Sequence, residues 1–563
     1  DIDASATSTW NSGAGFSPVG GRDSGGGWAP FQGTLNGLGH SISNLYINRP
    51  TSTYVGLFGA SQSAFVRDIA LISSSVTGYA QIGSLAGNAG STDIRNVSAS
   101  GSVHVAGCGC PSPDSGWAGG LAGIFSGVID GISSSVSVSA GSGAVNVGGL
   151  IGINSGTVSN SYSTGSISSA SLVYYVGGLI GRNQSVVANS YSTGNVVVGG
   201  SAGGGLVGEN VGSITDSHAT GSITGGDGFI GGLVGYLADG TVTNSYASGA
   251  VIAGYGGVAG GLIGNFRSGS VINSFATGAT TSGLYGLAGG LVGRLEFSPS
   301  SSSITNSYAT GATTSGEGGI AGGLVGYAGF SAHPWSITNS YATGAVNVGS
   351  LGQAGGLVGS SADSSPLTIS RSFATGSVTG ADGATNLGGL VGRAPAAQIS
   401  GSYATGNVLA GASSSSIGGL VGSTDGDTVI STSYSTGSVT SGPNSQLIGG
   451  IAGYNLGQIV NSYSTGSVSA GPNSICVGGL TGQNQSVIAN VYALGAVSAG
   501  TGSGYVGGLV GLHDAGLGSI TNGYWNKESN PSLNQYEGDT SAGGLTLAQL
   551  RNASNFTGFN FTT

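Results

Sequence analysis

The sequence repeats one phrase at a nearly fixed period along most of its length. The nine residues SITNSYATG occur at Ser303–Gly311 and again, unchanged, at Ser336–Gly344. Aligned on the aromatic residue, degenerate copies occur thirteen times, at intervals of 27 to 33 residues. A catalytic motif needs one copy, whereas a structural unit needs many. The period therefore predicts a repeat architecture, and it overrides the several globular domains that a chain of 563 residues would otherwise suggest.

Each copy of the phrase fixes several positions. Val or Ile lies four residues before the aromatic residue in all thirteen copies, Asn lies two before it in nine, and Gly lies three after it in twelve. A second phrase, GGLVG and its variants, recurs at the same period, with degenerate copies around Leu57 and Leu85. A third short segment such as GSVTG usually completes the period. Short β-branched runs separated by Gly, without helical spacing, predict three strands and three turns per repeat of roughly 29 residues.

Three short strands cannot bury their apolar faces alone, whereas stacked repeats form a continuous core. The chain is therefore predicted to be all-β, a single elongated parallel β-helix (β-solenoid) of about 16 rungs, spanning residues 55–525. At about 4.8 Å per rung this would make a rod of roughly 75 to 80 Å, of either handedness. Residues 1–54 are expected to form an N-terminal β-rich capping segment. Residues 526–563 are expected to form a C-terminal cap that could contain a short helix, Thr546 to Ala553.

Strand alternation predicts which residues of the phrase face the core. If Ile304 points inward, Asn306 and Tyr308 do too, although a bulge near the corner would turn the Tyr ring outward. The Asn residues would form an internal amide ladder, the rings would stack, and the following Gly would supply the positive φ of a tight corner. The predicted Asn ladder comprises Asn160, Asn189, Asn244, Asn273, Asn306, Asn339, Asn461, Asn490 and Asn522. The predicted Tyr ladder comprises Tyr162, Tyr191, Tyr246, Tyr308, Tyr341, Tyr403, Tyr434 and Tyr463.

Composition excludes several classes of protein. The chain has 117 glycines, 12 prolines, 6 % charged residues and a mean hydropathy of +0.23, which fits neither collagen nor charged disorder. The net charge is -10, and the single lysine and ten arginines are scattered, so no nucleic acid partner is expected. No apolar run has the ~18 to 20 residues of a membrane helix, so no membrane insertion is expected.

Parallel β-helices also house polysaccharide lyases and hydrolases, which cluster carboxylates on one outer face. Here the acidic residues are scattered, and the tightest pair, Asp425 and Asp427, has no basic neighbour in the sequence. The five histidines are isolated and lack metal-ligand spacing. We therefore predict no catalytic, cofactor-binding or metal-ligating residue, no cofactor, and no enzymatic activity.

Breaks in the repeat are candidates for specific binding. The stretch CGCPSPDSGW interrupts the period, and Cys108 and Cys110 within it could form a strained disulfide, stay reduced or contact a metal. The insertions LEFSPSSSS and FSAHPWS lie in adjacent repeats and should gather along one edge, where aromatic loops would form a binding strip. The alternative is that one corner merely tolerates insertions. The candidate binding residues are Trp117, Phe297, Phe330, His333 and Trp335.

The repeated phrases resemble the GLUG repeat, with GGLVGYAGF or GGLIGRNQS followed by NSYATG between Val55 and Trp525. The first residues, with FQGTLNGLGHSISNLYI, and the last, with GGLTLAQLRNASNF, look like the segments that flank such repeats in filamentous haemagglutinin-type secreted bacterial adhesins. The resemblance implies a long extracellular or surface-attached β-helical protein. Since the amino-terminal secretion domain of that family is not recognisable, we expect the chain to be part of a larger protein.

Together, the repeat and the resemblance predict a structural and adhesive rod of a secreted bacterial surface protein, located outside the cell or on its surface. Its expected partners are glycans or proteins on the surface of a host or neighbouring cell. A second hypothesis is a fibre or matrix subunit that joins copies of itself end to end by strand addition. A third is a carbohydrate-active β-helix enzyme.

Overall fold

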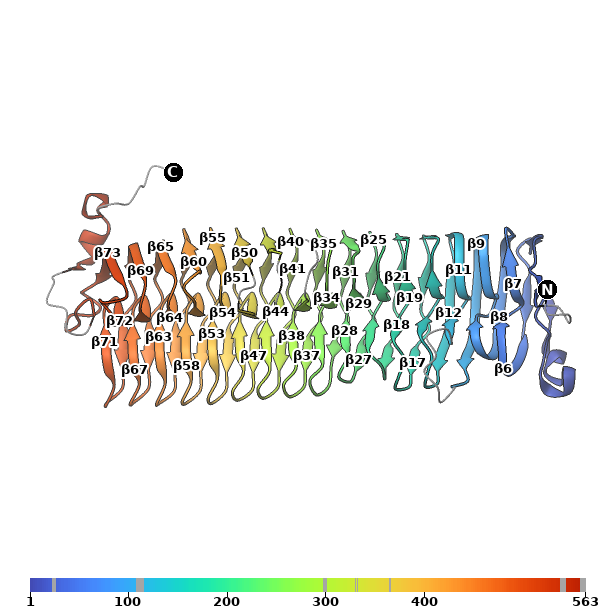
Figure 1. The fold of residues 1–563 in the computed structure, drawn as a ribbon, viewed down its shortest axis with the longest axis horizontal. Helices are drawn as coiled ribbons and strands as arrows, with labels where there is room; N and C mark the ends of the chain where they lie inside the picture. Colours follow the sequence, from blue (N-terminus) through green and yellow to red (C-terminus); the bar gives the residue numbers. More distant parts are fainter. Residues whose placement is uncertain are drawn as a thin grey trace. The chain divides into compact units, whose positions relative to one another are not determined.

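The chain is an all-β parallel β-solenoid of about 16 turns, which confirms the predicted fold class (Figure 1). Its contacts divide it into two compact units, Asp1–Gly278 and Ala279–Thr563. The computed structural model describes residues 1–22, 27–107, 116–296, 301–329, 331, 333–363, 366–536 and 543–556.

One turn of the first unit runs through five short strands, and each strand pairs in parallel with its counterpart in the next turn. The register sets equivalent residues side by side, as in Tyr162 with Tyr191. The prediction of three strands per repeat undercounts them, because bends within the phrases interrupt the strands. The strands of this turn are β14 (Ile151–Asn154), β15 (Thr157–Ser159), β16 (Tyr162–Ser163), β17 (Ile167–Ser169) and β18 (Tyr175–Gly177).

Turns of the second unit are built in the same way. A first turn comprises β39 (Val292–Leu295), β40 (Ser302–Thr305), β41 (Tyr308–Ala309), β42 (Thr313–Ser315) and β43 (Ile320–Gly322). Their partners in the next turn are β44 (Val325–Ala328), β45 (Trp335–Thr338), β46 (Tyr341–Ala342), β47 (Val346–Val348) and β48 (Gln353–Gly355). The two copies of SITNSYATG therefore lie one above the other in register.

The aliphatic residues of both phrases fill the interior of each unit. Burying one such side chain stabilises the fold by about 1.5–3 kcal/mol, and stacking repeats the gain at every turn. The buried residues of this kind in the first unit include Leu150, Val158, Leu179, Val187, Leu206, Ile214, Leu233, Val242, Leu262 and Val271. Those in the second unit include Leu291, Ile304, Leu324, Ile337, Leu357, Ile369, Leu390, Ile399, Leu420 and Ile430.

Glycine is required where the backbone comes close to itself. A Cβ on Gly322, the first Gly of its GGLVG phrase, would lie 1.8 Å from the carbonyl oxygen of Val325. A Cβ on Gly344, three residues after Tyr341, would lie 2.0 Å from the carbonyl oxygen of Gly311 in the neighbouring turn. Real side chains do not tolerate such overlaps, so these positions allow the turns to approach each other. The prediction that the Gly after the aromatic residue supplies a positive φ is wrong.

The positive φ of the corner belongs instead to the Asn position. Asn306 has φ 51° and Asn339 has φ 50°, and all nine residues of the predicted Asn ladder lie between 49° and 54°. Asn adopts this left-handed conformation more readily than most residues. One left-handed residue reverses the strand alternation, so Ser307 and Ala309 face the core and Tyr308 is turned to the outside, half-buried. The predicted inward direction of Asn306 and of the Tyr ring is therefore wrong, and the bulge alternative describes the ring.

A serine ladder occupies the interior position that we assigned to the asparagines. The Ser340 hydroxyl donates to the Thr338 carbonyl at 2.9 Å, as the Ser307 hydroxyl does to the Thr305 carbonyl at 2.8 Å. The Ser340 hydroxyl oxygen also accepts from the Ser307 backbone N–H at 3.2 Å. Because both groups are buried, each hydroxyl satisfies a backbone donor that would otherwise be unpaired. The signal was readable, since Ser immediately precedes the aromatic residue in eleven of the thirteen copies.

A second interior ladder, made of Asn, follows the GGLVG phrase. Asn154 donates to Asn183 at 2.8 Å, and Asn183 donates to Asn210 at 2.7 Å, all within the core of the first unit. In the second unit Asn455 donates to Asn484 at 2.7 Å. An internal amide ladder therefore exists, but at a different position from the predicted one.

The N-terminal residues join the first turns of the stack. Strand β1 (Ile2–Asp3) pairs with β5 (Ser41–Ser43), and β5 and β6 (Tyr46–Val55) pair in parallel with β8 (Phe65–Ile82). The 3-10 segment η1 (Ser5–Gly13) follows β1. Backbone N–H groups that donate from this region to the first turns belong to Ala4, Phe16, Val19 and Phe31. These bonds satisfy backbone carbonyl groups of the first turns, as a capping segment would.

The C-terminal residues cover the last turn of the second unit. Strand β73 (Ser519–Asn526) pairs with β74 (Gly544–Leu545), and helix α1 (Leu547–Leu550) follows with Thr546 as its N-cap. This helix lies in the region where we expected one. Phe556 packs edge-on against Tyr524, with ring centroids 5.2 Å apart.

Backbone bonds complete this C-terminal cover. The carbonyl oxygen of Asn534 accepts from the Gly508 N–H at 2.7 Å, and that of Gln535 accepts from Leu509 and Val510. The Asn530 side chain accepts from the Val497 N–H at 2.7 Å. The chain thus folds back over its own last turn.

Replacing Gly322 by Ala should destabilise the second unit, because the new methyl group overlaps the Val325 carbonyl. We expect a loss of about 3 kcal/mol or more, measured by urea unfolding followed by circular dichroism. The matched control is Gly426→Ala, since a Cβ there meets no atom within 4 Å and should change the stability by less than about 0.5 kcal/mol. Equal effects of the two substitutions would contradict the close-approach explanation.

Replacing Arg371 by Asn should stabilise the second unit. Arg371 occupies the corner position with φ 49°, between turns that carry Asn339 and Gly401 there. Asn tolerates this conformation better than Arg, so we expect a gain of about 0.5–1 kcal/mol in the same unfolding measurement. Arg371→Gln removes the same charge without the conformational preference of Asn. A gain as large in Arg371→Gln would assign the effect to charge and not to the corner.

Candidate functional site

The candidate binding residues at the breaks in the repeat do not form a strip of exposed aromatic loops. Trp335 is buried inside β45, in register with Leu367 in the next turn, and Trp117 is half-buried in β10 (Trp117–Gly119). Both rings therefore pack within strands, because these positions continue the stacked columns, and their assignment to exposed loops is wrong. His333 is exposed. The remaining predicted residues, Phe297, Phe330, Cys108 and Cys110, lie outside the described residues.

The predicted Asn and Tyr positions form two columns on the outer surface. Asn339 donates to Asn306 at 3.3 Å, and Asn490 donates to Asn461 at 3.0 Å. The rings beside them stack with centroids 4.7 to 5.0 Å apart and planes 1° to 7° apart. Stacking covers the ring faces, and pairing occupies the amides. These columns therefore stabilise the turns and leave mainly ring edges for a ligand.

His218 takes the place of a Tyr in the aromatic column of the first unit. Its ring lies 4.9 Å from the ring of Tyr191 and 4.7 Å from that of Tyr246, almost parallel to both. Burial lowers the pKa of the His218 imidazole below its ordinary value. The neutral ring is therefore the form that the column favours.

Two columns of side chains run beside the strands of the GGLVG phrase. In the first unit they are formed by the residue that follows each GGLVG phrase and by the residue at the start of the preceding strand. Arg182, on β19 (Ile180–Asn183), forms an ion pair with Glu209, on β24 (Val207–Asn210), with Nε and Oε2 2.6 Å apart. The Glu209 side chain is only 8 % exposed. The first column comprises Ile153, Arg182, Glu209, Tyr236 and Asn265. The second column includes Tyr175, Ala202, Phe229 and Val258.

The electrostatics of this segment follow from the buried carboxylate. Burial raises the pKa of Glu209, while the Arg182 charge and a hydrogen bond from Tyr175 oppose the rise. Burial and the Glu209 charge raise the pKa of Tyr175 to about 12, so its hydroxyl is protonated and donates. The acid, the base and the hydroxyl thus form a local ion-pair network, in which Arg182 Nε and Glu209 Oε2 are close but not aligned as a hydrogen bond.

The groove of the second unit has a different chemistry. A hollow of about 540 Å³ is lined by Leu287, Arg294, Ile320, Tyr327, Gln353, Ser360, Asn386 and Arg393. The described residues of this lining include no acidic side chain, and its two cations come from β39 and β54 (Val391–Ala394). Arg393 pairs with Asp363, whose side chain is 75 % exposed. This lining therefore combines the positive charge of Arg294 with aromatic, amide and hydroxyl groups.

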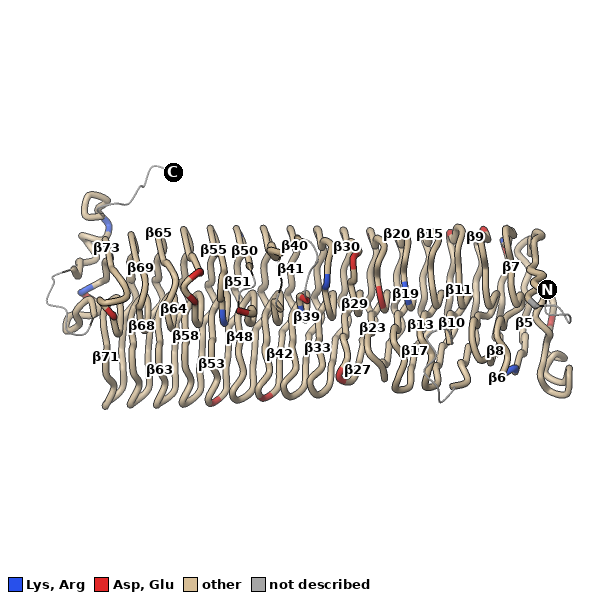
Figure 2. Tube along the Cα trace, in the orientation of Figure 1, with Lys and Arg blue, Asp and Glu red and all other residues tan. Residues whose placement is uncertain are grey.

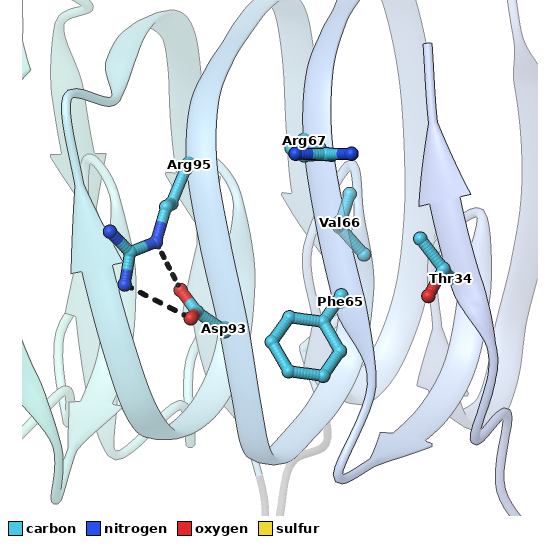
Figure 3. Close-up of a pocket in the computed structure, with 6 residues that line it drawn as sticks. All are labelled: Thr34, Phe65, Val66, Arg67, Asp93 and Arg95. Carbon is cyan, nitrogen blue, oxygen red and sulfur yellow. Dashed lines mark hydrogen bonds and ion pairs between the residues drawn. The ribbon is translucent and has the colours of Figure 1, made fainter.

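A third surface lies near the N-terminus of the first unit (Figure 3). Arg95, on β9 (Ala86–Val105), forms two hydrogen bonds with Asp93, at 2.9 and 3.1 Å. Phe65 lies next to Asp93 in register and is 55 % exposed. Figure 3 shows the Phe65 ring beside this ion pair. Phe65 and Arg67 both lie on β8, which pairs with β9. Because Asp93 occupies Arg95, the patch offers an aromatic ring and one less constrained cation, Arg67.

Charged residues are otherwise sparse along both units (Figure 2). Among the residues that the structure describes, no group of three or more His, Cys, Asp or Glu could hold a metal ion. In that same part of the chain, no helix has the length and apolar character needed to cross a membrane.

Acidification should destabilise the first unit through His218. Because its pKa is lowered in the folded state, the unfolded chain binds more protons as the pH falls through about 6.5, and stability is lost. We expect His218→Tyr, which restores the usual residue of the column, to lose less stability between pH 7.5 and pH 5. Thermal unfolding at both pH values measures the difference. An identical loss in both proteins would show that the ring does not sense pH.

Comparison with known proteins agrees with the repeat. The family model described as the GLUG motif matches residues 173–197, 199–224, 230–252, 285–315, 383–409 and 444–469. Halomucin of Haloquadratum walsbyi (strain DSM 16790 / HBSQ001) is 47 % identical over 109 residues, which cover 18 % of this chain and 1 % of halomucin. No solved structure matches the chain significantly.

These matches support the repeat assignment and leave the flanking segments untested. The resemblance to filamentous haemagglutinin-type adhesins has no support among them and stays a prediction. Each matched segment covers most of one turn, including its GGLVG phrase. The chain therefore carries at least six GLUG motifs, each folded within a turn of the parallel β-solenoid.

Proposed function

We propose that this chain is a structural and adhesive β-solenoid segment of a secreted bacterial surface protein. The proposal rests on the observation that the repeated residues stabilise the stacking of one turn on the next. Leu and Ile fill the core, Ser and Asn form interior ladders, and glycines let the turns approach. Such a scaffold presents its variable outward positions at fixed spacing, which suits contact with a repetitive surface.

The ends of the units favour this function over end-to-end polymerisation. Strand addition needs unpaired backbone groups on a terminal turn. The N–H groups of Gly508 and Leu509 instead bond to the carbonyls of Asn534 and Gln535. The N-terminal residues bond similarly to the first turns, as with Phe16 N–H and the Tyr46 carbonyl. Contact through the sides of the solenoid is therefore the mode that we propose.

We propose no catalytic role for the buried carboxylate of the first unit. Glu209 is held by Arg182 and by the Tyr175 hydroxyl, which supports a role in stabilising the stacked turns. A glycosidase of the usual kind needs two carboxyl groups about 5–9.5 Å apart across a bound sugar.

Surface location can be tested on intact cells of the source organism. An antibody raised against the purified chain should label unpermeabilised cells, with an antibody against an internal protein as the negative control. Labelling only after permeabilisation would contradict the proposed location.

Adhesion can be tested with beads coated with the purified chain. Under gentle flow, these beads should be retained on a layer of intact cells several-fold more than beads coated with serum albumin. Equal retention of the two kinds of bead would contradict the adhesive role and leave a spacer role.

A further inference from the structure

The groove of the second unit has two walls that repeat once per turn. One wall is the residue after each GGLVG phrase, and the other is the first part of the preceding strand. Along four turns the first wall presents Arg294, Tyr327, Ser360 and Arg393. The second presents Leu287, Ile320, Gln353 and Asn386. A linear polymer lying along the groove would therefore meet a new pair of side chains about every 4.8 Å.

The polar groups of this groove are only partly satisfied. Arg294 Nε and Gln353 Oε1 are buried atoms without a hydrogen-bond partner among the described residues. Buried polar groups in proteins are normally paired, so the lining is under-satisfied, and the half-buried Arg294 and Gln353 side chains favour a ligand that supplies an acceptor and a donor. A hydroxylated, anionic ligand offers both.

The charge of the groove favours carboxylates. Among the residues that the structure describes, the groove lining has no acidic side chain beside Arg294, whereas Arg393 forms an ion pair with Asp363. A guanidinium binds a carboxylate through two parallel hydrogen bonds. The net charge of -10 is spread over the whole chain, and salt screens charges more than about 10 Å apart. The cations of the groove therefore determine its interaction with an anionic ligand.

The rest of the lining suits a sugar chain. Tyr327 supplies an aromatic ring, Leu287 and Ile320 supply apolar contact, and Gln353 and Asn386 supply amides. A peptide would instead gain most from an open strand edge. Strand β44 offers none, because it pairs with β39 on one side and β49 (Val358–Ser361) on the other.

We infer that the groove lined by Arg294, Tyr327, Gln353 and Arg393 binds a linear polysaccharide containing uronic acid residues. Arg294 holds a carboxylate of the polymer, while Arg393, three turns further along and roughly 14 Å away, stays paired with Asp363. The inference rests on the proposed adhesive function and names the class of surface glycan that it recognises. The equivalent column of the first unit offers no such cation at Arg182, because Glu209 already pairs with that guanidinium.

Binding can be measured by titration calorimetry of the full chain with an alginate-derived hexauronate at low salt. We expect the hexauronate to bind and neutral cellohexaose to bind at least tenfold more weakly. Arg294→Gln should weaken hexauronate binding by about tenfold, as loss of a charge-assisted bidentate pair predicts, and Arg294→Lys by less. Arg371→Gln is the matched control, since Arg371 is exposed at a corner of the same unit and should leave binding unchanged.

Three results would overturn the inference: equal binding of cellohexaose, unchanged binding by Arg294→Gln, or tighter binding of a hexaglutamate peptide or a sulfated hexasaccharide than of the hexauronate. Circular dichroism of each variant identifies a folded protein before titration.

The bead assay separates the two proposals. If beads adhere equally with Arg294→Gln and with the unchanged chain, the groove inference fails and the adhesive function stands. If no bead adheres while hexauronate still binds, the adhesive function fails and the groove assignment stands.

Discussion

The close stacking of one turn on the next is the constraint on which the structure depends. Parallel pairing fixes the spacing between turns, and at that spacing several positions leave no room for a Cβ. Gly322 and Gly344 show this directly, since a methyl group on either would overlap a backbone carbonyl. The high glycine content thus has a steric cause, and it limits variation to the positions that face outward.

Stacking also determines where polar groups are placed. A side chain inside the solenoid has its own equivalent above and below, so a residue that can donate and accept with a copy of itself is satisfied at every turn. Ser340 and Asn183 both do this within the core. On the outside, Tyr341 and its equivalents stack instead. What distinguishes one turn from another is therefore concentrated at the residue after GGLVG, where Arg182 pairs with Glu209, whereas Arg294 meets no acidic side chain in the described groove lining.

The sequence alone predicted the solenoid, the number of turns and the register of the aromatic column, because these follow from the period. It failed on side-chain direction at Asn306, because a single left-handed residue reverses the alternation and no pattern of apolar residues shows its φ. Trp335 was misplaced because an insertion near it in the sequence suggested a loop, whereas the ring occupies a core column. The groove was missed although its signal is periodic: the residue after GGLVG varies from Arg to Tyr, Ser and Glu.

Amide hydrogen exchange of the folded chain tests the central claim most directly. If the interior ladders hold the turns together, the buried N–H groups of Ser307 and Ser340, which donate to the hydroxyls of the next turn, should exchange among the slowest in the second unit. Ser340→Ala should accelerate exchange at Ser307 far more than at residues of the outer corner. Exchange at Ser307 as fast as at the exposed turn around Gly426, or no change in Ser340→Ala, would contradict the account.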